Sequence, residues 1–142
     1  MSLSELCQAC GLCCDGTLFT VVPLAIDDQT PDGVTVDTKP TGARSLRQPC
    51  TALRGTCCTV YTQRPLACRR YQCLLFEAMQ SEEEHLEGAL KIVARAKALT
   101  AEVKPSLAEA RQAARQPGVA PDPTLERAEG WIKFHFLGHR RQ

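Results

Sequence analysis

The stretch that decides the fold is CQACGLCC, residues 7–14. It holds four cysteines, and all nine cysteines of the chain lie between Cys7 and Cys73. A Cys-x-x-Cys spacing lets two thiolates converge on one ion, and four such ligands complete a tetrahedral site. Four cysteines within eight residues are therefore strong evidence for a metal, and we expect this part of the chain to fold around it.

Five further cysteines complete the set: Cys50, the adjacent Cys57 and Cys58, Cys68 and Cys73. Disulfides are the main alternative to metal, but the number of cysteines is odd and the start of the chain shows no export signal. Because the cytosol keeps thiols reduced, we predict metal ligation rather than disulfides. Thiolates suit zinc, Cu(I) and iron–sulfur clusters, so the spacing leaves the metal open.

Eight thiolates would fill two tetrahedral zinc sites, and they exceed the four that one iron–sulfur cluster needs. Arginines near the cysteines in sequence can offset part of the negative charge. We expect Arg44, Arg47 and Arg54 to be solvated surface residues. Arg64 and Arg69 lie between cysteines, so we expect them to support the bound metal by donating hydrogen bonds to sulfur or to the backbone.

Length and composition limit the class of protein. The chain has 142 residues, with 44% hydrophobic and 23% charged residues and a formal net charge of +1. At about 150 residues per domain this predicts a single domain, residues 1–142. The balanced charge argues against a nucleic-acid partner, and no apolar run is long enough to span a membrane. With no signal peptide apparent at the start, we expect a cytoplasmic protein.

The composition changes near residue 74, from a cysteine-rich metal-binding region, 7–73, to a helical region, 74–142. We predict a small mainly-α protein with an irregular, metal-bound N-terminal half, one or two short strands and a helical C-terminal half. The expected elements of the first half are a short helix or a metal-wrapped loop at 3–14 with Ser4 as a possible N-cap, a strand at 17–22 ended by Pro23, a weaker strand at 33–36 and a helix at 66–78.

Helices are predicted throughout the second half. Ser81-Glu82-Glu83-Glu84 reads as a capping box that begins a helix, and Pro105 must kink or stop it. A second segment runs over 106–116, and Asp122-Pro123 opens a third helix that ends near Gly138. The predicted packing faces are formed by Leu86, Leu90, Val93, Ala96, Leu99 and Val103 in the first helix and Leu125, Ala128, Trp131, Ile132, Phe134 and Phe136 in the third.

The cysteine pattern resembles that of a known family over residues 7–73. The residues that carry the resemblance are Cys7-x-x-Cys10-Gly11-x-Cys13-Cys14, Cys50-x-x-Leu53 and Cys58-x-Val60-Tyr61-x-x-Arg64-Pro65-x-x-Cys68-Arg69-x-Tyr71-x-Cys73. This arrangement resembles the CxxCxxCC, or YkgJ-like, zinc- or iron-chelating domains. The resemblance implies metal chelation through Cys7, Cys10, Cys13, Cys14, Cys50, Cys58, Cys68 and Cys73.

Cys57 departs from the family pattern, which has a single cysteine before its Tyr-x-x-Arg-Pro step. It is expected to be an ordinary buried cysteine, with replacement of Cys58 as a ligand as the alternative. The cysteine set also looks like that of the larger flagellin lysine methylases. The chain shows no Gly-rich loop after a strand to hold a methyl donor, so methylation is not inferred.

Other polar residues are expected to be structural. His135 and His139 share a helix face, but with no third ligand in the pattern we expect them to belong to a basic helix end. His85 is expected to be solvated, and Asp27, Asp28 and Asp32 to form turns. The residues thus favour a zinc or iron protein with a structural or partner-docking role, through a protein partner or a homodimer, over an enzyme. An iron–sulfur redox protein and a metal carrier remain alternatives.

Overall fold

The computed structural model describes residues 2–137, and the chain divides into two compact units, Met1–Gln72 and Cys73–Gln142. The boundary falls close to the change of composition near residue 74. The protein is 46% helical and its strands are two to four residues long, so helix predominates. That the two units fold as one domain stays a prediction. Residues 2–137 contain no helix that is both long and apolar enough to cross a membrane.

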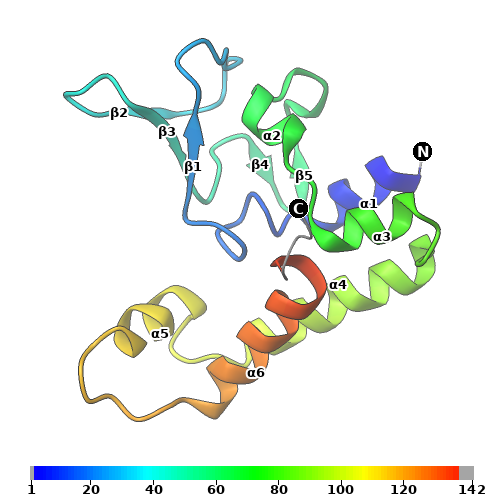
Figure 1. Cartoon of the computed structure of the whole chain (residues 1–142), viewed down its shortest axis with the longest axis vertical. Helices are drawn as coiled ribbons and strands as arrows, with labels where there is room; N and C mark the ends of the chain where they lie inside the picture. The colour runs from blue at the N-terminus through cyan, green and yellow to red at the C-terminus, as the bar shows by residue number, and fades with distance from the viewer. Residues whose placement is uncertain (1, 138–142) are drawn as a thin grey trace. The chain divides into compact units, whose positions relative to one another are not determined.

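The first unit combines short strands with short helices (Figure 1). One antiparallel sheet has the strand order β1-β3-β2, with Val22 and Val36 both opposite Leu46, and a separate hairpin pairs β4 with β5. The elements are α1 (Ser2–Cys10), β1 (Val21–Leu24), β2 (Val36–Thr38), β3 (Arg44–Arg47), β4 (Leu53–Arg54), β5 (Cys57–Cys58), the 3-10 turn η1 (Tyr61–Gln63) and α2 (Leu66–Arg70).

The strand predicted at 17–22 is displaced toward the C-terminus. Strand β1 begins at Val21 and contains Pro23, so this proline does not end the strand as expected. Strand β1 lies at the edge of the sheet, where a residue without an N–H is tolerated. The strand predicted at 33–36 begins only at Val36. The central strand β3 carries a single apolar residue, Leu46, so its sequence lacks the alternation of apolar and polar residues that would have predicted a strand.

The helix predicted at 3–14 is present only as far as Cys10. Gly11 has φ = +66°, a left-handed conformation that glycine adopts at no steric cost and that ends the helix. Ser4 lies inside α1 and is not its N-cap, since the helix begins at Ser2. The remaining residues of the predicted segment form a turn, which agrees with the alternative of a loop for residues 11–14.

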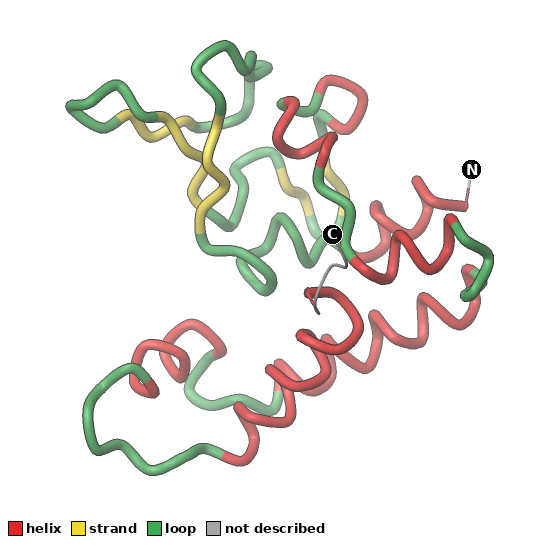
Figure 2. Tube along the Cα trace, viewed as in Figure 1, coloured by secondary structure: helices red, strands yellow, loops and turns green. Residues whose placement is uncertain are grey.

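The second unit is helical for most of its length (Figure 2). In Figure 1 the longest helix, α4, runs beside α6 in the opposite chain direction, and α6 continues directly into a π-helical turn. The elements are α3 (Leu74–Gln80), α4 (Leu86–Ala101), α5 (Leu107–Ala114), α6 (Pro123–Ile132) and the π-helical turn η2 (Lys133–Leu137).

A hydrophobic core joins α4, α5 and α6. Its buried members are Leu99, Val103, Ala110, Leu125 and Ala128. Polar contacts fix the same helices, since Trp131 Nε1 donates to the Ile92 carbonyl at 3.1 Å. Arg111 and Glu129 form an ion pair at 2.6 Å that ties α5 to α6. The core positions Val93, Ala96 and Ile132 are buried as the helical pattern predicted.

Two positions of the predicted packing faces are exposed, and two others, Leu86 and Trp131, are half-buried. Leu90 is 36% exposed and Phe134 is 76% exposed. Phe134 belongs to the π-helical turn, which shifts side chains away from the α-helical period of the preceding residues. The simple helical pattern was therefore wrong for Phe134, whereas Phe136 is buried as expected.

Of the two helix starts predicted from capping residues, one was correct and one was wrong. Asp122 caps α6, because its carboxylate accepts hydrogen bonds from the Thr124 and Leu125 N–H groups, and Pro123 is the first helical residue as predicted. The capping box at Ser81 was wrong, since Ser81 instead ends α3, with its hydroxyl donating to the Ala78 carbonyl. Helix α4 begins at Leu86, and it ends at Ala101, before Pro105, as expected.

Candidate metal centre

The first four cysteines are presented by α1 and by the turn that follows it. Cys7 and Cys10 lie on the last turns of α1, and Cys13 and Cys14 follow the break at Gly11. A Cβ at Gly11 would approach Thr56 backbone atoms at 3.1 Å, so the absence of a side chain lets the β4–β5 hairpin lie close. The break thus separates Cys7 and Cys10, on the helix, from Cys13 and Cys14, on the turn that follows.

The turn that carries Cys13 and Cys14 is tied to the residues around Cys50. The Cys50 N–H donates to the Cys14 carbonyl at 2.7 Å. The Gln48 side chain donates from Nε2 to the Cys13 carbonyl at 3.1 Å, and Gln48 is only 9% exposed. Its Oε1 atom is buried and has no hydrogen-bond partner among the described residues. These contacts bring Cys50 beside a segment that is 36 residues earlier in the chain.

The β4–β5 hairpin places Cys58 against α1. The Gln8 Oε1 atom accepts a hydrogen bond from the Cys58 N–H at 2.9 Å, which fixes β5 to the helix that carries Cys7 and Cys10. Cys57 is exposed, and its Sγ donates to the Gln8 carbonyl oxygen at 3.7 Å. The expectation that Cys57 is an ordinary buried cysteine was therefore wrong, whereas Cys58 is half-buried.

Cys68 and Cys73 are separated by a break that the sequence analysis missed. The helix predicted at 66–78 is two helices, because residues 71–73 are extended between α2 and α3. Cys68 lies in α2, within the first unit. Cys73 begins the second unit and caps α3, its Sγ accepting from the Phe76 N–H at 3.4 Å.

The thiols of the first unit raise one another's pKa. Burial first, and then the charges of Cys13, Cys50 and Cys58, raise the pKa of Cys68 to about 11. Burial likewise raises the pKa of Cys7 and of Cys58, with repulsion from Cys13 as a further cause in both. A thiolate at one of these cysteines therefore disfavours ionisation of the neighbouring thiols, as expected where like charges share a poorly solvated region.

The adjacent Cys13 and Cys14 behave as a pair. Their Sγ atoms are 3.9 Å apart, close enough for one thiol to donate to the other. That hydrogen bond is the largest cause that lowers the pKa of Cys13 and the largest cause that raises the pKa of Cys14. The pair thus favours a single thiolate shared through this hydrogen bond. Charges of Cys50 and Cys58 add to the raised pKa of Cys14.

Arg64 is the cation of this group. It opposes the raised pKa of Cys7, Cys58 and Cys68 and contributes to the lowered pKa of Cys13. Arg69, which the sequence analysis placed in the same role, is exposed on α2. Of the arginines expected at the surface, Arg54 and Arg47 are exposed, and Arg47 pairs with Asp37 at 3.1 Å.

Arg44 was expected to be solvated, but it is half-buried. Its Nη2 donates to the carbonyls of Ala25, Ile26 and Asp28 at 2.9, 3.1 and 2.6 Å. Those three carbonyls converge because the chain turns through residues 25–28. Arg44 therefore acts as a structural residue within the first unit rather than as a surface charge.

Six thiols share one charge environment: Cys7, Cys13, Cys14, Cys50, Cys58 and Cys68. Within residues 2–137 no three His, Cys, Asp or Glu side chains lie close enough together to hold a metal ion. The thiols therefore share a region without converging on one point. The donor set fits zinc or iron, because thiolate sulfur is a soft ligand and a bound cation offsets the repulsion that raises the thiol pKa values.

The histidines stand apart from the cysteines in the chain. His135 is half-buried in the second unit, with its ring 4.1 Å from the Trp131 ring and 4.8 Å from the Phe134 ring, measured between centroids. Burial lowers the pKa of His135, opposed by the charge of Glu84. His85 is exposed, as expected. His139 lies outside the described residues.

Three residues that connect the cysteine segments were not singled out as site residues: Gln8, Asp28 and Gln48. Gln48 donates a hydrogen bond, and Gln8 and Asp28 each accept one, and the partner residue is 35 to 50 positions away in the chain. Asp28 was expected only to form a turn, yet its carboxylate is buried and binds the start of α2. No spacing rule links such distant partners, so the sequence carries no local pattern that would have found them.

Comparison with known families identifies the cysteine region. The family model CxxCxxCC, described as "Putative zinc- or iron-chelating domain", matches residues 6–90. The match covers more than half of the 142 residues and includes all nine cysteines. No curated protein and no solved structure matches the chain. Together with the cluster of mutually interacting thiols, this match shows that the chain belongs to the CxxCxxCC family of zinc- or iron-chelating domains.

Proposed function

We propose that this protein holds zinc or iron through eight thiolates, those of Cys7, Cys10, Cys13, Cys14, Cys50, Cys58, Cys68 and Cys73. The observation that carries the proposal is that six of these thiols lie near enough for their charges to act on one another, with Arg64 acting on four of them. When bound, the metal supplies positive charge to the thiolates and cross-links the segments that carry them. Metal binding then releases the thiol protons, so ligation and folding are coupled.

A structural role for the metal is supported by the weak core of the first unit. Among its described residues, the buried hydrophobic side chains of the core are Leu6, Leu12, Leu46 and Ala52. A unit of this size with so few large buried side chains needs another source of stability, and metals commonly provide it in small domains. We therefore infer that the metal stabilises the first unit rather than serving a reaction.

Anaerobic purification of the full chain, followed by elemental analysis and a visible spectrum, tests this function. A colourless protein that contains zinc supports the structural assignment, and mononuclear iron also satisfies the proposal. Inorganic sulfide with a brown absorption would replace it with the iron–sulfur redox alternative. A protein that contains no metal and binds neither zinc nor iron in titration contradicts the proposal.

A metal carrier is favoured by one observation. The eight candidate ligand cysteines are half-buried rather than fully buried, so solvent and small chelators can reach them. A carrier must release its ion on contact with a client, whereas a structural site retains it. The exchange rate with a chromogenic chelator separates the two: complete transfer within seconds supports a carrier, and retention over hours supports a structural site.

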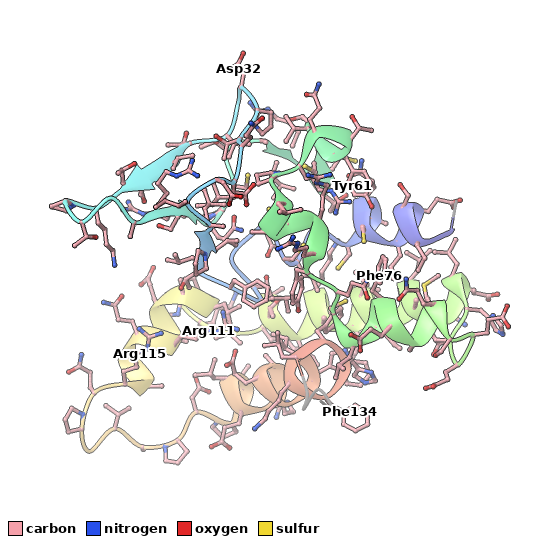
Figure 3. All side chains as sticks on the ribbon, turned by 45° about the horizontal axis from the view of Figure 1, so that its top comes forward. Asp32, Tyr61, Phe76, Arg111, Arg115 and Phe134 are labelled. Carbon is pink, nitrogen blue, oxygen red and sulfur yellow. The ribbon has the colours of Figure 1, made fainter. Side chains whose placement is uncertain are left out.

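The helical unit is proposed to dock a protein segment that combines apolar and basic side chains. An open groove of about 620 Å³ is lined by Leu75, Ile92 and Phe134, with Glu83 and Glu84 among its polar residues. Figure 3 shows the Phe134 ring extending away from the helix. Acidic residues around an apolar groove complement an amphipathic basic helix.

A leucine–lysine model helix, titrated into the full chain, tests this docking role. Phe134→Ser should weaken binding of the peptide, whereas Val119→Ser, at an exposed apolar position that does not line the groove, should not. A concentration-dependent dimer that Phe134→Ser abolishes would instead assign the groove to a second copy. Equal binding by both variants contradicts the proposal.

A further inference from the structure

Asp28 provides a hydrogen-bonding cap for α2 from a distant part of the chain. Its side chain is 5% exposed, and its Oδ1 and Oδ2 atoms accept from the N–H groups of Leu66 and Ala67 at 2.7 and 3.0 Å. The first N–H groups of a helix have no partner within the helix. The preceding residue, Pro65, offers no side-chain cap to α2. Asp28 therefore satisfies these N–H groups in place of a local cap, from 38 residues earlier in the chain.

The position of Asp28 is itself fixed. Its N–H donates to the Ala25 carbonyl at 3.1 Å, and its own carbonyl accepts from Arg44 Nη2 at 2.6 Å. Arg44 belongs to β3 and lies opposite Leu24 in the sheet, so the turn between Leu24 and Asp28 is held by the paired strands. The carboxylate consequently reaches α2 from a rigid support, which is what accurate placement of a ligand requires.

Besides Asp28, the start of α2 is fixed by the buried Pro65 that precedes it, and the helix itself adds little. It is five residues long, and none of its residues is buried. Its far end is fixed by Tyr71, whose ring meets the Phe19 ring edge-on at a centroid distance of 4.8 Å. Cys68 is the residue directly after the two whose N–H groups bind Asp28. The direction of the Cys68 side chain therefore depends on how the first turn of α2 is held.

We propose that Asp28 is a positioning residue of the metal centre, which fixes Cys68 by capping α2 and is itself held by Arg44. This inference rests on the proposed role of Cys68 as a ligand. A buried carboxylate is costly unless it is hydrogen-bonded, and here both of its oxygens are used on the segment that carries a candidate ligand. Loss of an outer-sphere residue of a metal site commonly weakens metal affinity by about 10–100-fold.

Competition titration of the full chain with zinc and a chelator tests the inference in a double-mutant cycle. Asp28→Ala should weaken zinc binding by about 10–100-fold in the native background. It should have little further effect when Cys68 is already serine, because the position of a missing ligand no longer matters. Asp28→Asn keeps one acceptor oxygen in an isosteric side chain and should rescue part of the affinity. Asp27→Ala, at the exposed neighbouring position, is the control and should bind normally.

The absorption spectrum of the cobalt-substituted protein reports the ligand geometry, which a general loss of stability would not change at full metal occupancy. Asp28→Asn should alter the thiolate-to-cobalt charge-transfer absorption at full occupancy, since one sulfur is displaced. If Asp28→Ala fails to fold, Asp28→Asn in the same cycle decides the outcome. Equal losses of affinity in the native and Cys68→Ser backgrounds would overturn the inference. If Cys68→Ser weakens zinc binding and the Asp28 variants do not, the inference is also overturned, but the proposed function stays intact. No effect of Cys68→Ser would remove Cys68 from the ligand set and the inference with it.

Discussion

The guanidinium carbon of Arg64 lies 3.9 Å from the centroid of the Tyr61 ring, and Arg64 Nε donates to the Tyr61 carbonyl at 2.9 Å. Both contacts hold the arginine within its own segment, in the first unit, where Figure 3 marks Tyr61. The charge of the same guanidinium opposes the raised pKa of Cys7, Cys58 and Cys68 and contributes to the lowered pKa of Cys13. A cation that is both stacked and hydrogen-bonded is well placed to stabilise thiolates without binding the metal itself.

Replacing Arg64 should weaken metal binding. Arg64→Ala removes the stacked cation beside the thiols, and we expect a loss of zinc affinity of about 10–100-fold in competition with a chelator. Arg64→Lys should recover only part of it, because an ammonium group cannot reproduce the planar guanidinium contacts. Arg47→Ala is the matched control, since Arg47 is exposed and pairs with Asp37. Unchanged affinity in Arg64→Ala would show that the arginine serves another purpose.

Single serine substitutions should distinguish ligands from the surplus cysteine. We expect Cys10→Ser, Cys13→Ser, Cys58→Ser and Cys68→Ser each to reduce the metal bound per chain, measured by elemental analysis. Cys57→Ser should leave it unchanged, because Cys57 is exposed and only its neighbour Cys58 has a backbone N–H held by Gln8. Equal metal loss from Cys57→Ser would reverse the assignment of the adjacent pair.

Removing the metal should unfold one region and spare the other. Residues 7–73 have few buried apolar side chains, whereas 82–137 include the core shared by α4, α5 and α6. Circular dichroism before and after chelation should therefore show a modest loss of signal, with most of the helix retained. Collapse of the helical signal together with the metal would show instead that the two regions unfold as one cooperative domain.

His135 should make the helical unit less stable in mild acid. Burial lowers its pKa in the folded chain below the ordinary value of 6.5, and the charge of Glu84 opposes this. As the pH falls below 6.5, the unfolded chain therefore binds a proton more readily than the folded chain does. We expect the free energy of unfolding, measured with urea, to decrease as the pH falls from 7 to 5.5.

A matched pair of variants checks the origin of this pH dependence. His135→Gln should flatten the dependence, and His85→Gln, at an exposed position, should preserve it. Both variants are compared at the same metal content, so that changes in ligation do not contribute. An identical slope in His135→Gln and in the native chain would assign the dependence to other groups.

Local chemistry in the sequence was sufficient for parts of the fold. Asp122 and Pro123 begin α6 as predicted, because a cap needs only the residues that immediately follow it. The apolar period of α4 correctly placed Val93, Ala96 and Leu99 in the core. The order of the cysteines, with Arg64-Pro65 between Cys58 and Cys68, resembled the family pattern closely enough to predict the family, and the family model confirms that prediction.

Only the tertiary structure decided the remainder. Ser81 has the pattern of a helix start but ends α3, because its N–H and hydroxyl donate to carbonyls of that helix. Pro23 lies opposite Ser45 in an edge strand, a pairing that depends on the distant strand β3. Asp28 looks like a turn residue in the sequence, and its capping of α2 depends on a tertiary contact between residues 38 positions apart. The sequence thus supplied the candidate ligands, and long-range hydrogen bonds decided how the segments that carry them are held, because such bonds depend on contacts that no local pattern encodes.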